Sequence, residues 1–133
     1  MPGHTGAWVN YPVIPLDPDD VFEAISNSRR RQVLLSLDRS DSPISAGDLA
    51  VELAAIENGV ETDAVTSEQR SRVYIALTQV HLDTLQEIGA VKYDSRSKQV
   101  ASTDATAGLA EIIRRIESSC YSPESDCGGE GGL

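Results

Sequence analysis

Hydrophobic residues recur every three or four positions along most of this chain, which is the spacing of helices that bury one face. The spacing predicts helices over 18–25, 28–37, 46–56, 67–88 and 105–118. The fourth helix is the longest, about 22 residues or roughly 33 Å at 1.5 Å per residue. Its predicted buried face consists of Tyr74, Leu77, Thr78, His81, Leu82, Leu85 and Ile88.

Residues that commonly cap helices stand at the starts of the first four segments. Asp17 is followed by a proline, which is favoured at the first helical position, and by two further acids. Ser28 and Ser45 are the expected caps of the second and third helices, and Thr66 or Ser67 is the expected cap of the fourth. These signals favour separate helices joined by short connections.

After Gly89 the pattern changes from helical spacing to the alternation of strands. Residues 90–93 form a predicted strand, 94–97 a turn and 98–103 the returning strand, and Ile44-Ser45 is expected to add a short strand beside them. The predicted fold class is therefore mainly α with a small antiparallel β wing, a winged helix-turn-helix of order α-α-α-α-β-β-α. About ten residues separate its third and fourth helices, where a turn of three or four is usual.

The 133 residues suit one domain with two tails. Residues 1–16 are interpreted as an N-terminal arm, 17–118 as the winged-helix domain and 119–133 as a disordered tail rich in Gly, Ser and Pro. Trp8, Tyr11 and Ile14 give the arm apolar side chains that could pack on a neighbour. Cys120 and Cys127 are interpreted as spare thiols in the tail rather than as a redox or metal pair.

The formal charge is −10, from 21 acidic and 11 basic residues, which disfavours binding to a polyanion at low salt. An acidic chain with two lysines and nine arginines suits concentrated salt, where the screening length falls to about 3 Å. No run of 18 apolar residues and no signal peptide is visible in the sequence. We therefore expect a cytoplasmic protein that does not bind membranes.

Basic and amide side chains nevertheless concentrate in three places: the run Arg29–Arg31, the exposed side of the fourth helix, and the wing. Arg72 and Gln79 are residue types that can hydrogen-bond base edges, and the wing has an excess of two positive charges for phosphates. The predicted DNA contacts are Arg29, Arg30, Arg31, Ser67, Gln69, Arg70, Arg72, Gln79, Lys92, Arg96 and Lys98. The alternatives are a solvated helix face, lysines that keep an edge strand soluble, and arginines that pair with Glu23 or Asp48 within the fold.

The last predicted helix has an apolar stripe suited to pairing with a second copy, through Leu109, Ile112, Ile113 and Ile116. His81 falls on the apolar face of the fourth helix and is interpreted as a hydrogen-bonded core histidine. The sequence has no Gly-rich phosphate loop, no zinc-ligand spacing and no nucleophile with a plausible base. We therefore expect no enzyme activity, no cofactor and no metal.

Three segments resemble one family: DVFEAISNSRRRQVLLSL at 20–37, the stretch from ENGV to HLDTL at 57–85, and HLDTLQEIGAVKYD at 81–94. They are similar to a winged-helix domain common in haloarchaeal genomes, itself similar to ArsR-type repressors, over roughly 17–103. The resemblance implies a DNA-binding helix-turn-helix, a salt-adapted archaeal cytoplasm and a homodimer. No ArsR metal site carries over, because the cysteine motif of those sensors is absent.

Two functions follow from these expectations. The first is a dimeric winged-helix regulator of transcription that binds DNA through the fourth helix and the wing. The second keeps the fold but makes it a protein-interaction module without direct DNA binding, in which the acidic surface and the apolar arm contact a protein partner.

Overall fold

A computed structural model describes residues 13–120 of the chain. These residues are mainly helical and include one small three-stranded antiparallel sheet, so the coarse fold class is confirmed. The elements are α2 (Pro18–Ile25), α3 (Ser28–Arg39), β1 (Ile44–Ser45), α4 (Ala46–Asn58), the 3-10 turn η1 (Thr62–Ala64), α5 (Ser67–Ala76), the π-helical turn η2 (Leu77–His81), α6 (Leu82–Glu87), β2 (Val91–Asp94), β3 (Gln99–Ser102) and α7 (Thr106–Ser119).

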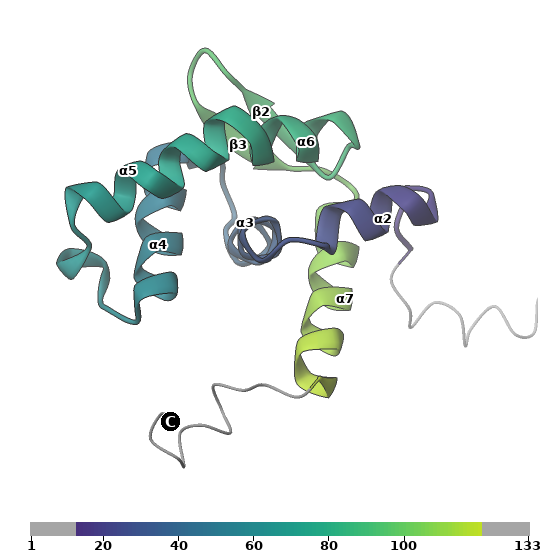
Figure 1. Ribbon diagram of the computed structural model, residues 1–133. Coiled ribbons are helices and arrows are strands. Elements are labelled where there is room, and N and C mark those ends of the chain that lie inside the picture. The colour runs from purple at the N-terminus through teal and green to yellow at the C-terminus, as the bar shows by residue number, and fades with distance from the viewer. Residues whose placement is uncertain (1–12, 121–133) are drawn as a thin grey trace, which may run out of the picture.

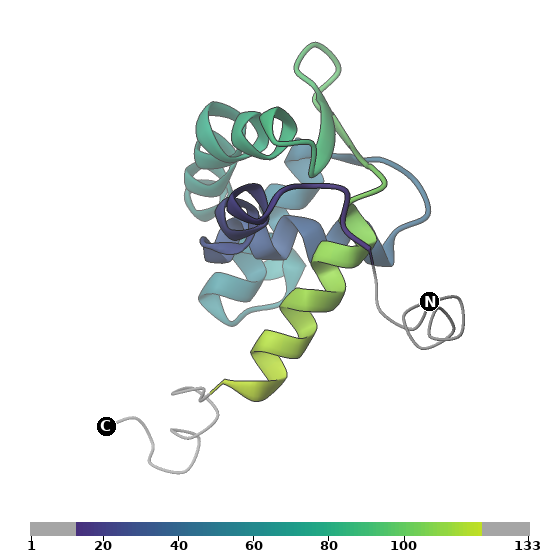
Figure 2. The same ribbon diagram turned by 90° about the vertical axis from the view of Figure 1, so that its right-hand side faces the viewer.

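Helix α3 lies at the centre, with α4 and α5 on one side and α2 and α7 on the other (Figure 1). The hairpin formed by β2 and β3 projects from one end of the molecule, and the C-terminal end of α7 lies towards the opposite end (Figure 2). The core between these elements is built from fully buried aliphatic side chains, among them Leu34, Leu53, Leu77 and Leu82. Ile14, from the predicted arm, packs against this core.

The sheet has the strand order β1-β3-β2, and the expected pairing of Ile44-Ser45 with the hairpin is confirmed. Ile44 lies opposite Val100 in β3. The returning strand begins at Gln99 rather than at Lys98, because Lys98 adopts a left-handed backbone with φ 61°. Its N–H closes the turn by donating to the Asp94 carbonyl at 2.7 Å.

The caps agree with the sequence in part. The Ser45 hydroxyl accepts from the Asp48 N–H at 3.0 Å, and Thr66 and Gln69 form a capping box at the start of α5. The expected cap at Ser28 is wrong by one residue, because the Asn27 side chain accepts from the N–H groups that open α3. Asp17 precedes α2 but makes no side-chain capping hydrogen bond, so the proline after it starts this helix by its fixed φ.

The predicted fourth helix is present but is not a uniform α-helix. It continues from α5 through the π turn η2 into α6. Leu77 and Leu82 are both fully buried although they are five residues apart, a spacing that would separate them by about 140° on an α-helix. The wider π turn brings both side chains to the core, which confirms that they belong to one buried face, although the π turn itself was not predicted.

The prediction that α7 dimerises through four apolar residues is wrong for two of them. Leu109 and Ile113 are fully buried against the rest of the core, where α7 packs on α3. Arg114 of α7 donates to Asp38 of α3 at 2.6 Å, which helps hold the two helices together. Ile112 is half-buried, and Ile116 is exposed.

The predicted tail begins too early, because Ser119 ends α7 and Cys120 follows it as an exposed free cysteine. Trp8, Tyr11 and Cys127 lie outside the described residues. Within residues 13–120, no helix is long and apolar enough to cross a membrane.

Candidate nucleic-acid interface

The first turns of α5 place Arg70 on the surface beside the start of α4. The Arg70 guanidinium lies 5.6 Å from the centroid of the Tyr74 ring, a cation–π distance. Its Nη2 is also close to the first turn of α4, since a Cβ built on Gly47 would lie 3.4 Å from it. Among residues 13–120 no acidic side chain pairs with Arg70. Arg70 is therefore held by an aromatic ring and keeps its charge available to an anion.

The same corner of the molecule includes the hairpin turn. The N–H of Ala46, at the start of α4, donates to the Lys98 carbonyl at 2.8 Å. The positive end of the α4 dipole, Arg70 and the hairpin turn thus meet, with Asp48 in the first turn of α4 as the opposing charge. Two of the N–H groups that open α4 are already used, by the Lys98 carbonyl and the Ser45 hydroxyl, so a phosphate at this corner would be bound mainly by the cations.

The hairpin carries three exposed cations, Lys92, Arg96 and Lys98, without an ion-pair partner in the described part of the chain. The exposed Asp94 carboxylate accepts the N–H of Arg96 at 2.9 Å. That backbone hydrogen bond, with a second from Ser97, lowers the pKa of Asp94 and keeps it ionised. Asp94 therefore shapes the turn that presents Arg96, although its charge partly offsets the basic tip.

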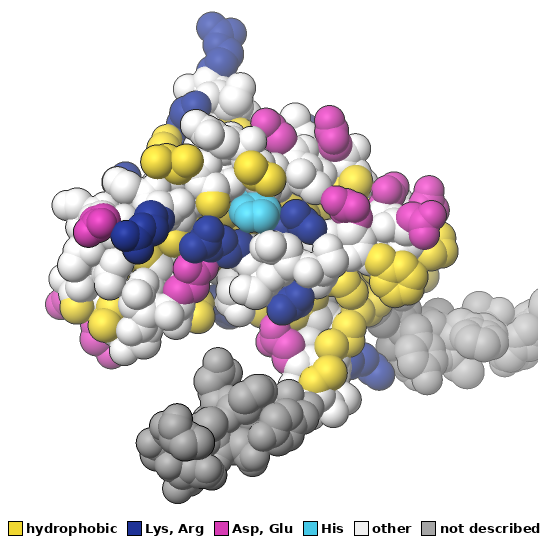
Figure 3. All heavy atoms as spheres, in the orientation of Figure 1, with side chains coloured by type: hydrophobic (Ala, Val, Ile, Leu, Met, Phe, Trp, Pro, Cys, Tyr) yellow, Lys and Arg dark blue, Asp and Glu magenta, His cyan; other side chains and the backbone are white. Residues whose placement is uncertain are grey.

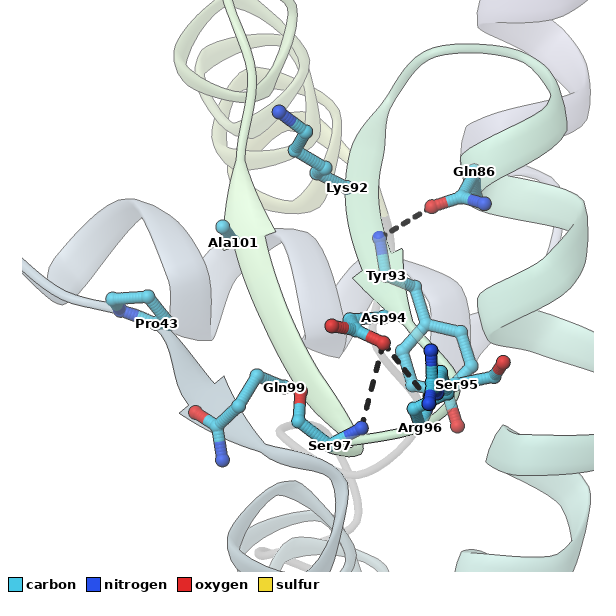
Figure 4. A pocket seen from close by; sticks show the side chains of 10 residues that line it. All are labelled: Pro43, Gln86, Lys92, Tyr93, Asp94, Ser95, Arg96, Ser97, Gln99 and Ala101. Carbon is cyan, nitrogen blue, oxygen red and sulfur yellow. Dashed lines mark hydrogen bonds between the residues drawn. The ribbon is translucent and has the colours of Figure 1, made fainter.

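Lys92 stands on the solvent face of the sheet, above a shallow hollow of about 530 Å³ (Figure 4). Pro43, Gln99 and Ala101 line the same hollow. The Gln86 side chain accepts the Tyr93 N–H at its rim, so α6 is tied directly to β2 (Figure 4). The hollow is open, and the hairpin is braced by the long helix rather than free to swing.

Three further predicted contacts lie on the long helix. Ser67 is exposed at its start, and Gln79 is exposed in the π turn. Arg72 forms an ion pair with Glu68 at 3.1 Å, and both side chains are exposed. An exposed pair of this kind contributes about 0.3–0.5 kcal/mol, so a phosphate could displace Glu68 at low cost.

Gln69 is less available than the sequence suggested. Its side-chain oxygen accepts the Thr66 N–H at 2.9 Å in the capping box, and the residue is half-buried. A base edge would have to compete with the start of the helix for this oxygen. Gln69 therefore serves mainly to start the helix. Of its side-chain amide, the NH₂ group remains free to reach a partner.

The run Arg29–Arg31 is occupied inside the fold, which corrects the prediction that it lies ready for DNA. Arg29 donates twice to Glu57, at 2.6 and 2.8 Å. Arg31 donates to the Ile25 carbonyl at 2.7 Å and lies 3.7 Å from Glu117. These arginines pair within the fold, which was the alternative to DNA contact, although their acidic partners are not Glu23 or Asp48.

Arg30 is the buried member of the run, 9% exposed. It donates to the Glu23 carbonyl at 3.1 Å, to the Ser26 hydroxyl at 2.9 Å and to His81 Nδ1 at 3.3 Å. The guanidinium joins α2 and α3 to the π turn of the long helix. Arg30 is a structural residue and cannot reach a phosphate.

His81 makes the hydrogen bond expected of a core histidine, although it is half-buried rather than fully buried. Arginine has only donors, so His81 Nδ1 is the acceptor and the ring is neutral. Burial lowers the pKa of His81, and the charges of Arg30 and then Arg29 lower it further. The pKa of His81 therefore depends on whether the contact between Arg30 and His81 is intact.

The lowered pKa of His81 predicts that the protein loses stability in mild acid. The pKa of His81 is lower in the folded state than in the unfolded chain, so the unfolded chain binds the extra proton first as pH falls below about 6.5. The free energy of unfolding should therefore fall between pH 7.5 and 5.5. The slope should stay well below the about 1.4 kcal/mol per pH unit of one full proton, because the ring is partly exposed. Urea unfolding measured along this range tests it, with His81→Gln as the control that should flatten the slope; equal slopes in both proteins would contradict it.

Basic and acidic side chains occupy different parts of the face shown in Figure 3. A basic side chain projects from the hairpin tip, and further basic side chains form a row beside the histidine, some of them next to acids (Figure 3). Acidic side chains gather over α6 and α2 (Figure 3). Helix α6 contains two exposed acids, Asp83 and Glu87. The long helix is therefore suited to an anion at its N-terminal end and unsuited to one at its C-terminal end.

Sequence reasoning missed two features of this surface. The stacking of Arg70 on Tyr74 could have been found from their i, i+4 spacing on a helix. The exposure of Val80, 51%, could not, because Val80 lies in the π turn, which decides where its side chain points. Within residues 13–120, no group of three His, Cys, Asp or Glu side chains could hold a metal ion.

A family model, described as a domain of unknown function, matches residues 22–101, from α2 to β3. No curated protein and no solved structure matches the chain.

Proposed function

The chain belongs to the domain family DUF7344, whose function is unknown, and we propose that this member is a winged-helix DNA-binding regulator of transcription. One observation carries the proposal: Arg70, which has no acidic partner within residues 13–120, and the exposed hairpin turn meet at the positive end of α4. A helix start and a hairpin lie together at this corner. In winged-helix proteins these two elements contact DNA together. A phosphate backbone lying along it would be bound by Arg70, Arg96 and Lys98.

The order of the elements supports the proposal. Helix α3, strand β1, helices α4 and α5 and the β2–β3 hairpin follow one another as in winged-helix domains, and the strand order β1-β3-β2 agrees with that arrangement. In helix-turn-helix proteins the second helix enters the major groove with its N-terminal residues leading. Here those residues are Ser67, Arg70 and Arg72, while Asp83 and Glu87 lie farther along, away from the groove.

The roles of the side chains differ within this arrangement. Arg70, Lys92, Arg96 and Lys98 would contact phosphates and set the register without reading sequence. Arg72, released from Glu68, is the side chain suited to the O6 and N7 atoms of a guanine. Sequence selectivity should therefore depend on Arg72 more than on the hairpin.

The net charge of −10 sets the conditions in which such binding is effective. At low salt the field of the whole protein repels DNA, whereas at about 1 M salt screening over about 3 Å leaves mainly the local contacts. We propose on this ground, and on the resemblance to the haloarchaeal and ArsR-type proteins, that the protein works in a salt-adapted archaeal cytoplasm.

The test is selection of genomic DNA fragments by the full chain in about 1 M KCl. We expect a restricted set of fragments to be enriched, with Arg72→Ala relaxing the selectivity and Arg96→Ala weakening binding to all fragments. If no fragment is enriched and neither substitution changes the recovered DNA, the proposal is wrong.

A second function has one observation in its favour. Ile75 and Val80 are half-exposed aliphatic side chains on the long helix, where a DNA-reading helix usually presents polar groups. They suit an apolar protein surface, so the domain could instead bind a protein partner and leave DNA alone. Purification from a salt-adapted host separates the two functions. A stoichiometric protein partner that is lost in Ile75→Ser and Val80→Ser, with no bound DNA, favours the second.

A further inference from the structure

An apolar groove runs between α2, α7 and the segment that precedes α2. Its volume is about 390 Å³, and every side chain that lines it is apolar. The lining comes from the preceding segment through Ile14 and Leu16, from α2 through Phe22 and Ile25, and from α7 through Ile112 and Ile116. We call it the α2–α7 groove.

The walls of the groove are only partly covered by the described residues. Phe22 is 65% exposed and Ile116 is 41% exposed. Hydrophobic side chains collect over α2 and α7 on the face shown in Figure 3. Contiguous apolar patches on the surface of a small domain indicate a contact with another group, so the groove needs an occupant.

We propose that the α2–α7 groove binds residues 1–12 of the same chain, with the Trp8 and Tyr11 rings against its exposed side chains. The course of the chain supports this occupant. Ile14 already lines the groove and packs against the core, so the residues before it start at the edge of the groove. Tyr11 lies three positions before Ile14 and Trp8 lies six, which an extended chain spans with at most about 11 Å and about 22 Å.

The composition of residues 1–12 suits this groove. Trp8, Val9 and Tyr11 supply large side chains, and each aromatic ring can bury about 150–250 Å². Residues 1–12 contain no acid, although the whole chain has 21. Helix α2, which forms one wall, has three acids and no basic residue: Asp19, Asp20 and Glu23. A segment without acids can therefore approach α2 without repulsion between like charges.

Residues 121–133, which follow α7, are the other candidate from this chain. They include three acids and no basic residue, so the acids of α2 would repel them. Their only aromatic residue is Tyr121, and they contain no tryptophan. Charge and aromatic content therefore both favour residues 1–12.

The groove lies away from the proposed DNA surface. The hairpin projects from one end of the molecule, and α7 extends towards the other (Figures 1 and 2). Residues 1–12 in the groove would join α2 to α7 and leave the hairpin and the start of α5 uncovered. The inference does not rest on the proposed function, and it can be tested without DNA.

The fluorescence of Trp8 tests the proposal, because Trp8 is the only tryptophan of the chain. In the full chain we expect acrylamide to quench Trp8 several-fold less efficiently than in the urea-unfolded protein. Phe22→Ser and Ile116→Ser should each raise the quenching constant towards the unfolded value, because each removes part of the apolar wall. Ile56→Ser is the matched control: Ile56 is 50% exposed but lies on α4, and its replacement should leave the quenching unchanged.

The protein concentration distinguishes the chain's own segment from a second copy. Protection of Trp8 within one chain should be the same between about 1 and 100 μM, because an intramolecular contact does not follow mass action. Protection that appears only as the concentration rises would mean that another copy supplies the occupant, and it would overturn the proposal. Quenching of Trp8 in the folded full chain that equals the quenching in urea would overturn it as well.

A photo-crosslinking residue at position 8 locates the contact and does not depend on the groove variants. In a mixture of isotope-labelled and unlabelled full chains, we expect crosslinks within single chains that map to α2 and α7. Crosslinks between different chains, or to helices other than these two, would contradict the proposal. A protected Trp8 in a protein that ignores DNA removes only the proposed function, and an accessible Trp8 in a protein that selects DNA removes only this inference.

Discussion

Replacing Arg70 and Arg96 together by glutamate should lower the affinity for a selected DNA fragment at least about a hundredfold. Each reversal removes a cation from a phosphate and leaves a repelling charge, and about 1.4 kcal/mol for each site corresponds to this factor. Arg70 is the stronger site, because the Tyr74 ring already orders its guanidinium and no acid must be displaced. Fluorescence anisotropy of a labelled fragment measures the change.

The salt dependence gives an independent reading of the same variant. Loss of two phosphate contacts should reduce the slope of log affinity against log salt concentration by about 1.8, at about 0.9 for each contact. Arg39→Glu serves as the charge control, since Arg39 is exposed and already pairs with Glu52 at 3.2 Å. If Arg39→Glu causes the same loss of affinity, net charge governs binding rather than the positions of Arg70 and Arg96. If the double variant binds DNA normally, the assignment of Arg70 and Arg96 is wrong.

Replacing Leu82 by alanine should lower the free energy of unfolding by about 2–5 kcal/mol. Leu82 is fully buried at the point where the π turn passes into α6. The substitution opens a cavity among side chains that include Leu77 and Leu85, and small domains have only about 5–15 kcal/mol in total. Urea unfolding followed by circular dichroism measures the loss.

Val80→Ala is the control for the neighbouring surface. Val80 lies in the same π turn but is half-exposed, so its replacement should change the free energy of unfolding by less than about 0.5 kcal/mol. An equal loss in the two variants would mean that the π turn does not direct Leu82 inward. The comparison therefore tests the phase of the long helix as well as the packing of its core face.

Much of the fold was predictable because it depends on local chemistry. The Ser45 cap, the change from helical to alternating spacing after Gly89 and the short strand at Ile44 are each specified by a few neighbouring residues. The exposed cations of the hairpin and of the first turns of α5 were predictable for the same reason, since polar residues at turns and on outer helix faces meet solvent. The proposed DNA surface is therefore largely visible in the sequence.

The errors concern residues whose roles depend on distant partners. Arg29 meets Glu57 across 28 positions of the sequence, and Arg30 meets His81 across 51. Nothing local distinguishes such arginines from arginines that await a phosphate. Gln69 is a different case, because the capping box that occupies it was readable from Thr66 three residues earlier.

The sequence by itself determined the order of helices and strands, the main caps and the basic character of the hairpin, because these follow from side chains within a few residues of each other. The tertiary structure alone decided which members of an apolar stripe are covered. It buried Leu109 and Ile113 against α3 and left Phe22 and Ile116 outside, and it set the phase of the long helix through the π turn. The physical reason is that burial is a property of the packed whole: a periodic stripe shows that one face will be covered but not which element will cover it.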